Sequence, residues 1–337
     1  MKAIVYTKYG PPDVLQLKEV EKPTPKDNEV LVEVHAASVN YNNLGRITGK
    51  PFLVRLMSEG LLKPKHKIPG NNIAGRVEAV GRNVTQFQPG DEVFGNLTEC
   101  GFGAFAEYVA VPENVLALKP ANISFEEAAA VPEAALVALQ ALRDKGHIQT
   151  GQKVLIYGAS GGIGTFAVQI AKAFGAEVTG VCSKRNLDMV RSIGADHVID
   201  YTQEDFTQNG QRYDLIVATA GYRSIFDYKR ALGPKGIYVA TGGSMRGPNA
   251  MAQIYQALFL GPWFSMLGSK KLGSMTLRIN PKDLFFMKEL IEAGKVKPVI
   301  DRRYTLSEVA EALRYYEEGH SRGKVVITVD QNNNTSL

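Results

Sequence analysis

A glycine-rich segment in the middle of the chain has the residue types and spacing of a phosphate-binding turn. It reads GASGGIG over residues 158–164, after an apolar β-branched run at 154–156, and an apolar helical repeat follows as far as Phe174. Small residues let the backbone approach a pyrophosphate, and free N–H groups at the start of a helix attract the anion. Ala159 stands where the strict G-x-G-x-x-G pattern would have its first glycine. The prediction of a dinucleotide site therefore depends on the strand before the turn and the helix after it. The alternative is a tight turn that binds no ligand. The residues expected at the pyrophosphate are Gly158, Ala159, Ser160, Gly161, Gly162 and Ile163.

The end of the next expected strand, EVTGVC at 177–182, predicts which nucleotide binds. In such folds a carboxylate at this point bonds the ribose 2′-hydroxyl and selects NAD. Here the strand is followed by Ser183, Lys184 and Arg185. A hydroxyl and two cations suit a 2′-phosphate. The alternative is a solvated Lys-Arg pair at a helix start, but cations there oppose the helix dipole. We therefore expect NADPH.

Asn40, Tyr41 and Asn43 form a second group, made of uncharged hydrogen-bond donors. Such donors suit an oxygen that gains negative charge when hydride is added to a carbon conjugated with a carbonyl group. Tyr41 is the only one of the three that can release a proton, so we expect it to act as the acid. Capping of strand and helix ends is an equally good explanation for any one of them.

The elements that must position these residues change in kind near residue 120. Before it the chain is rich in strand-like runs separated by turns. A helical, alanine-rich stretch is expected at 125–145, and from Lys153 strands alternate with helices, which predicts a doubly wound parallel sheet. The early strands are expected at KAIVY, EVLVEVHAASV, AGRVEAVG, EVFGNL and AEYVAV.

Two domains are expected, one inserted in the other, in an α/β protein with its active site in the cleft between them. Residues 1–123 and 280–330 would form the first domain, which regains helices at 284–293 and 307–318 and a strand at 324–329. Residues 124–279 would form the nucleotide domain, and the polar tail 331–337 is expected to be disordered.

The composition is that of an ordinary globular protein of 337 residues, with 45% hydrophobic and 22% charged residues. The net charge of +5 is scattered along the chain, whereas nucleic-acid binding would need a dense basic stripe. Two cysteines, Cys100 and Cys182, cannot form a disulfide framework and suit a reducing cytosol. The N-terminal sequence lacks the apolar core of a signal peptide, so a cytoplasmic location is expected.

The segment 247–269 carries no charge and is strongly apolar. It approaches the length needed to cross a bilayer. Glutamines, glycines and Pro262 interrupt it, and we expect a hydrophobic helix and lid at a substrate cleft or subunit contact, with no membrane span.

The nucleotide motif also resembles a known family. The pattern is that of the quinone oxidoreductase and ζ-crystallin branch of the medium-chain dehydrogenases/reductases, and the resemblance covers roughly residues 1 to 330. It implies a GroES-like, β-rich catalytic domain joined to a Rossmann domain. It also implies cofactor contacts from Tyr201, from the turn that contains Thr241 and Gly242, and from Lys324. The signature is filled in register by Gly151, Gln152, Leu155, Ala159, Ser160, Gly161, Gly162, Gly164, Gln169 and Lys172.

Alcohol dehydrogenases of this superfamily bind a catalytic zinc through a cysteine, a Gly-His-Glu segment and a later cysteine. The resemblance places Asn40 at the first position and Gly70-Asn71-Asn72 at the second. Asparagine is a poor zinc ligand, and the five histidines show no ligand spacing. We expect no zinc and therefore none of the alcohol oxidation that depends on it.

The segment from Val39 to Asn43 is similar to the corresponding part of crotonyl-CoA reductases and their carboxylating relatives. Gly70-Asn71 is similar to mitochondrial-type enoyl thioester reductases, and Glu99 lies near a glutamate of the carboxylating enzymes. The quinone reductase branch usually carries aspartates where Asn43 and Asn72 stand. Amides in their place would admit an anionic acyl-CoA.

The function expected is therefore NADPH-dependent reduction of activated C=C bonds, with short enoyl-CoA substrates favoured. Quinone reduction is the first alternative and a non-catalytic NADPH-binding protein the second, while CO₂ as a co-substrate is an extension of the main hypothesis. The resemblance also implies a homodimer or dimer of dimers, since a strand near 272–277 would leave a sheet edge to pair.

Overall fold

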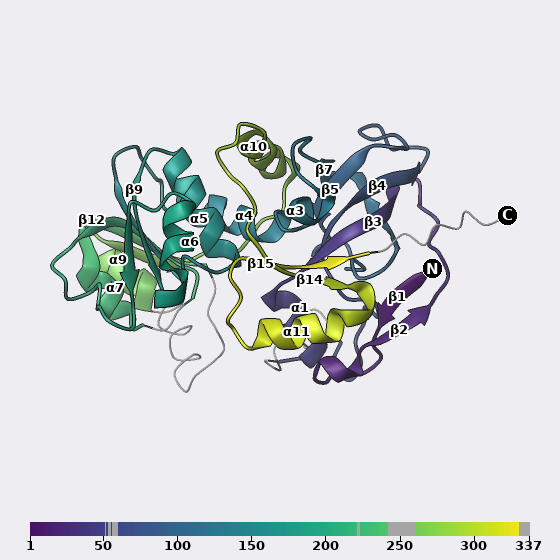
Figure 1. The fold of residues 1–337 in the computed structure, drawn as a ribbon, viewed down its shortest axis with the longest axis horizontal. Helices are drawn as coiled ribbons and strands as arrows, with labels where there is room; N and C mark the ends of the chain where they lie inside the picture. Colours follow the sequence, from purple (N-terminus) through teal and green to yellow (C-terminus); the bar gives the residue numbers. More distant parts are fainter. Residues whose placement is uncertain (51, 53–54, 56–59, 221–222, 242–259, 330–337) are drawn as a thin grey trace. The chain divides into compact units, whose positions relative to one another are not determined.

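The structure is a computed structural model of the 337-residue chain. It describes all residues except 51, 53–54, 56–59, 221–222, 242–259 and 330–337. The chain forms two compact units (Figure 1). The first unit contains residues 1–133, 279–292 and 298–337, and the second contains residues 134–278 and 293–297. The first unit thus extends to Glu133, beyond the boundary predicted at residue 123.

A seven-stranded sheet forms the centre of the first unit. The long strand β3 pairs antiparallel with β4, β6 and β15, while β14 joins β15 in parallel. Beyond β4 the sheet continues through β5 to β7, and β1 and β2 form a separate hairpin. The strands are β1 (Lys2–Val5), β2 (Gln16–Glu19), β3 (Glu29–Val39), β4 (Asn72–Val80), β5 (Glu92–Asn96), β6 (Tyr108–Pro112), β7 (Leu116–Leu118), β14 (Ile300–Thr305) and β15 (Lys324–Thr328).

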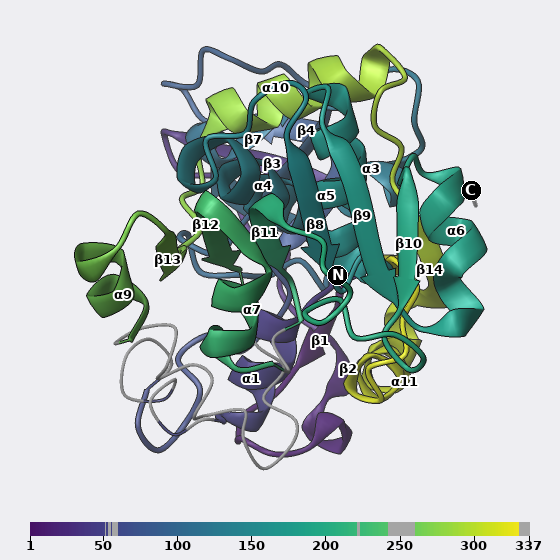
Figure 2. The ribbon, with the colours of Figure 1, turned by 90° about the vertical axis from the view of Figure 1, so that its left-hand side faces the viewer.

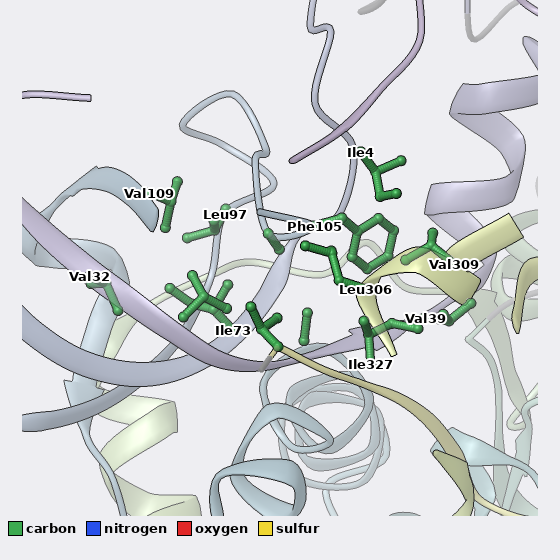
Figure 3. Close-up of a cluster of buried hydrophobic side chains, with 14 of the residues drawn as sticks. Ile4, Val32, Val39, Ile73, Leu97, Phe105, Val109, Leu306, Val309 and Ile327 are labelled. Carbon is green, nitrogen blue, oxygen red and sulfur yellow. The ribbon is translucent and has the colours of Figure 1, made fainter. Parts of the chain in front are cut away.

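Apolar side chains from several of these strands share one core (Figure 3). Ile73 of β4, Ile327 of β15 and the loop residue Phe105 are fully buried in it. Burial of one such side chain contributes about 1.5–3 kcal/mol, so the sheet is held mainly by this packing. The helices of the unit are α1 (Tyr41–Thr48), α3 (Phe125–Ala129), α10 (Pro281–Glu292) and α11 (Val309–Glu317).

The second unit is a six-stranded sheet in which every strand is parallel to its neighbours (Figure 2). Its strand order is β10-β9-β8-β11-β12-β13, so the order reverses between β8 and β11. This is the doubly wound dinucleotide-binding topology, whose ligands sit at the carboxyl ends of the strands around that reversal. The elements are β8 (Lys153–Tyr157), α5 (Gly162–Ala173), β9 (Glu177–Cys182), α6 (Leu187–Ser192), β10 (His197–Asp200), β11 (Tyr213–Ala218), α7 (Ile225–Ala231), β12 (Leu232–Ala240), α9 (Gly261–Leu267) and β13 (Lys271–Ser274).

The predicted fold class is confirmed, and the differences are local. The expected helix at 125–145 is divided into α3, α4 (Pro132–Gln140) and a π-helical turn at Ala141–Lys145. The break between α3 and α4 falls before Pro132, because a proline cannot continue a helix begun before it. The sequence did not predict α1, β2, β7 or β14. Residues 331–337 and most of 247–269 lie outside the described residues, and only α9 covers part of the latter. Within the described ranges no helix is long and apolar enough to cross a bilayer.

Candidate functional site

The glycine-rich turn joins β8 to α5 and is shaped by two close approaches. Gly158 has a positive φ of 85°, and a Cβ there would lie 2.6 Å from the Thr219 hydroxyl oxygen. That hydroxyl donates to the carbonyl oxygens of Tyr157 and Gly158 at 3.1 Å. A Cβ on Gly164 would lie 2.1 Å from the Gly158 carbonyl oxygen, so α5 can pack this close to the turn only with glycine.

The start of α5 suits an anion. The first backbone N–H groups of a helix have no acceptor within it, and the N-cap residue Gly161 has no side chain that could cap them. A Cβ on Gly161 would still have room, with its nearest neighbour 3.5 Å away. The predicted pyrophosphate residues therefore form one continuous turn, and they fit the phosphates of a dinucleotide.

The turn after β9 brings the predicted ribose residues together. Ser183 is partly exposed, and Lys184 and Arg185 are exposed in a short 3-10 turn. Tyr201, which is 50% exposed, follows β10, and its backbone N–H donates to the Cys182 carbonyl at 3.2 Å. Two cations, a hydroxyl and a phenol thus lie around the end of β9. The adjoining Asp200 carboxylate accepts hydrogen bonds from Thr202.

Thr241 follows β12, and its backbone N–H and hydroxyl both donate to the Ala218 carbonyl, at 3.0 and 3.3 Å. This places Thr241 at the carboxyl ends of β11 and β12, beside the reversal of strand order. Gly242, the other residue predicted in this turn, lies outside the described residues.

In the first unit, Asn40, Asn43, Asn71 and Glu133 form a hydrogen-bonded group that we term the amide cluster. The Asn40 amide nitrogen donates to Asn71 Oδ1 at 2.6 Å and to Glu133 Oε2 at 2.8 Å. The amide of Asn43 donates to the same Asn71 oxygen at 3.0 Å. Asn71 in turn donates to Glu133 at 2.6 Å and to the Thr98 hydroxyl at 2.8 Å. The three asparagines are buried, and the cluster joins β3, α1, β4 and α4.

Asn40 and Asn43 also form the capping box of α1. The Asn40 side chain accepts from the Asn43 N–H at 3.1 Å, and the Asn43 side chain accepts from the Asn40 N–H at 3.0 Å. Both hydrogens of the Asn40 amide are donated within the chain, to Asn71 and to Glu133. Tyr41, the first residue of α1, is 39% exposed and is the member of the predicted group that reaches solvent. A catalytic role for any of the three remains a prediction.

Glu133 was missed by sequence reasoning. Its carboxylate accepts from the amides of Asn40, Asn42 and Asn71. Loss of water around it raises the pKa of Glu133, while the nearby Lys324 charge, the amide hydrogen bonds and Arg46 act in the opposite direction. A signal was present, because Glu133 is the single charged residue of the stretch 128–142.

Lys324 is 4% exposed at the start of β15, and its ammonium group donates to the Val39 carbonyl at 3.0 Å. Burial lowers the pKa of Lys324 to about 8, against the opposing effect of the Glu133 carboxylate. A buried lysine close to its neutral form can exchange a proton near physiological pH. The residue predicted as a cofactor contact is therefore part of the environment of the amide cluster.

The residues present do not fit a zinc ion. Asn40 and Asn71, the counterparts of two zinc ligands, bond each other and Glu133. Asn72 is also buried, and it donates to Ser38 and accepts from Asn96. Among the residues that the structure describes, no three histidine, cysteine or acidic side chains are grouped so as to hold a metal. The donors that zinc prefers, thiolate and imidazole, are replaced by amides whose hydrogen bonds are made within the protein.

Comparison with known proteins gives the family. Residues 26–121 match the alcohol dehydrogenase GroES-like domain, and residues 193–327 match a model described as zinc-binding dehydrogenase. The 2-methylene-furan-3-one reductase of Solanum lycopersicum is 35% identical over 339 residues, which cover 97% of this chain and 79% of the relative. The chloroplast envelope quinone oxidoreductase homolog of Arabidopsis thaliana is 33% identical, with 97% and 98% of the two chains covered.

The solved structures agree with this result. The quinone oxidoreductase from Coxiella burnetii superposes with a TM-score of 0.83 at 29% identity, and the match covers 98% of this chain and 99% of that one. The similarity to both relatives and to this solved structure thus covers nearly the full length of the chain. The chain belongs to the zinc-free quinone oxidoreductase branch of the medium-chain dehydrogenase/reductase superfamily.

Proposed function

We propose that this protein is an NADPH-dependent reductase of carbon–carbon double bonds conjugated with a carbonyl group, with short enoyl-CoA thioesters as the favoured substrates. The observation that carries the proposal is the amide cluster at the start of α1, the helix whose first residue is Tyr41. A metal-independent reduction needs an acceptor carbon that is already electron-poor, together with hydrogen-bond donors for the oxygen that gains charge.

The cofactor supplies the hydride when it is bound. Gly158 to Ile163 would hold its pyrophosphate, and the 2′-phosphate would contact Ser183, Lys184, Arg185 and Tyr201. The absence of an acidic side chain at the end of β9 supports NADPH over NADH. Thr241, Gly242 and Lys324 remain proposed cofactor contacts.

Tyr41 is proposed to hydrogen-bond the substrate carbonyl oxygen and to provide a proton. Its position at the start of α1 is fixed by the capping box, and the amide cluster ties that box to Glu133. In this proposal Asn40 and Asn43 serve the reaction by orienting Tyr41. The amide cluster contains no positively charged side chain. In this proposal the carbonyl oxygen of the substrate therefore receives its hydrogen bond from Tyr41.

Quinone reduction is the second candidate. It is favoured by the names of two similar proteins, the quinone oxidoreductase homolog of Arabidopsis thaliana and the quinone oxidoreductase from Coxiella burnetii. The name of the Solanum lycopersicum relative instead describes a methylene group conjugated with a ketone, which favours reduction of a double bond. The third possibility is a protein that binds NADPH without turnover.

The deciding experiment follows NADPH oxidation with crotonyl-CoA or acryloyl-CoA beside phenanthrenequinone. The proposal expects a higher kcat/KM with the thioester. Turnover of the quinone alone would replace it with the second candidate, and NADPH binding without turnover of either substrate would favour the third. A carboxylated product that depends on bicarbonate would extend the reaction to CO₂.

Assembly and location are two further parts of the proposal. In the described part of the sheet, β13 pairs with β12 alone, and a homodimer through this edge would cover its unpaired backbone groups. Sedimentation equilibrium tests the dimer. A cytoplasmic location is proposed from the two free cysteines, which suit a reducing compartment.

A further inference from the structure

Asn186 is a buried amide that connects the two phosphate-binding turns of the second unit. Only 4% of the residue is exposed. Its amide nitrogen donates to the Ser160 hydroxyl at 2.9 Å and to the Ser183 hydroxyl at 3.3 Å. Ser160 belongs to the glycine-rich turn before α5, and Ser183 follows β9. One side chain therefore contacts both turns.

The direction of these two hydrogen bonds matters for an anion. An amide nitrogen carries two hydrogens, and Asn186 places one on each serine. Each serine hydroxyl accepts through a lone pair and keeps its own hydrogen for another acceptor. Both serines are partly exposed, so this hydrogen remains accessible. Asn186 thus sets both hydroxyls as donors, which is the role that phosphate oxygens require.

Packing alone does not explain an asparagine at this place. Its other polar atom, Oδ1, is buried and has no hydrogen-bond partner. A buried acceptor without a partner costs stability, and an aliphatic side chain would avoid that cost. The amide is explained by what its nitrogen does for Ser160 and Ser183.

We propose that Asn186 is a positioning residue for cofactor specificity, which orients the Ser160 and Ser183 hydroxyls as donors and links the pyrophosphate turn to the 2′-phosphate turn. The inference rests on the proposed NADPH specificity and deepens it. The two cations of the turn supply attraction, while Asn186 supplies the direction of the hydrogen bonds.

The test is calorimetric binding to the full-length protein of adenosine 2′,5′-bisphosphate and of 5′-AMP, which differ only in the 2′-phosphate. Asn186→Ala is expected to weaken binding of the bisphosphate about tenfold, which corresponds to the loss of one hydrogen bond to a charged group. Binding of 5′-AMP should weaken about threefold or less. Asn186→Asp should weaken the bisphosphate further, since its carboxylate would accept both hydroxyl hydrogens and repel the phosphate. Gln169→Ala removes another buried amide of this unit, which bonds Thr165 and Lys297, and should leave the ratio of the two affinities unchanged.

Ser183→Ala provides an independent measure, because its side chain is partly exposed and its loss should not prevent folding. The double variant Ser183→Ala/Asn186→Ala should lose less affinity for the bisphosphate than the two single losses combined, because the part of the Asn186 effect that acts through the Ser183 hydroxyl is already absent in Ser183→Ala. Additive losses, or an unchanged affinity ratio in Asn186→Ala, would overturn the role of Asn186 while leaving NADPH specificity intact. A wild-type protein that does not prefer the bisphosphate would overturn the 2′-phosphate assignment itself, and this inference with it.

Discussion

Replacement of Lys324 by methionine should change how the stability of the protein depends on pH. In the folded chain, burial lowers the pKa of Lys324 from 10.5 to about 8. Between these two values the unfolded chain binds the proton and the folded chain does not. The stability contribution of this group is therefore fully present above pH 10.5 and is lost as the pH falls towards 8. Lys324→Met removes this dependence.

The magnitude follows from the two pKa values. One pH unit within this interval corresponds to about 1.4 kcal/mol, so the difference in unfolding free energy between wild type and Lys324→Met should change by about 2 kcal/mol from pH 8 to pH 9.5. The wild type gains on the variant as the pH rises. Methionine has a similar length and no charge, so the packing around β15 is largely kept.

Urea unfolding followed by tyrosine fluorescence and circular dichroism, at half-unit steps from pH 7 to pH 9.5, measures this difference. Lys119→Met serves as a control, because the Lys119 side chain is only 5% exposed, donates to the Pro120 and Ile123 carbonyls and pairs with Glu92. The control measures how much the free energy of unfolding falls when the contacts of a lysine are removed. A wild-type-to-Lys324→Met difference that stays constant across this range would refute the reasoning about Lys324.

Other changes test the two candidate sites. The double variant Lys184→Ala/Arg185→Ala should raise the KM for NADPH by tenfold or more, with little effect on the KM for NADH. An equal increase in both KM values would contradict the 2′-phosphate assignment. Tyr41→Phe should lower kcat on enoyl thioesters about 10²-fold or more while the Kd for NADPH stays the same, and unchanged turnover would return Tyr41 to a structural role. Gly164→Ala should abolish nucleotide binding, because its Cβ would lie 2.1 Å from the Gly158 carbonyl oxygen. Gly273→Ala is the control and should bind the nucleotide normally, because a Cβ at Gly273 has no atom within 4 Å. Prolonged dialysis against a chelator should leave turnover unchanged, and a loss that zinc restores would contradict the expectation that the protein binds no zinc.

The second unit could be predicted closely from the sequence because its signals are local. An apolar run, a glycine-rich turn and an amphipathic helix lie next to one another along the chain, and their order fixes the parallel sheet. The position of Tyr201 beside Ser183 could also be expected, since parallel neighbours end at the same edge of a sheet. The Asn186 bridge could not, because a contact between two turns depends on side-chain geometry that no periodicity reports.

The first unit was harder to predict for the opposite reason. Its sheet brings together segments as distant as β3 and β15, and short strands such as β7 and β14 have little pattern of their own. The helix α1 was missed because its residues, YNNLGRIT, include three poor helix formers, and it forms because Asn40 and Asn43 cap it. Tertiary contacts with Asn71 and Glu133 then hold the cap in place.

The amide cluster shows why Asn40, Asn71 and Glu133 must be considered together. A buried carboxylate is stable only when its oxygens are hydrogen-bonded or a cation lies near. Asn40, Asn42 and Asn71 supply the hydrogen bonds, and Lys324 supplies a positive charge that its own burial opposes. Loss of water favours the neutral form of Glu133 and of Lys324, while the charge of each favours the charged form of the other. While both groups are ionised, the pair adds no net charge near Asn40 and the start of α1, where Tyr41 stands.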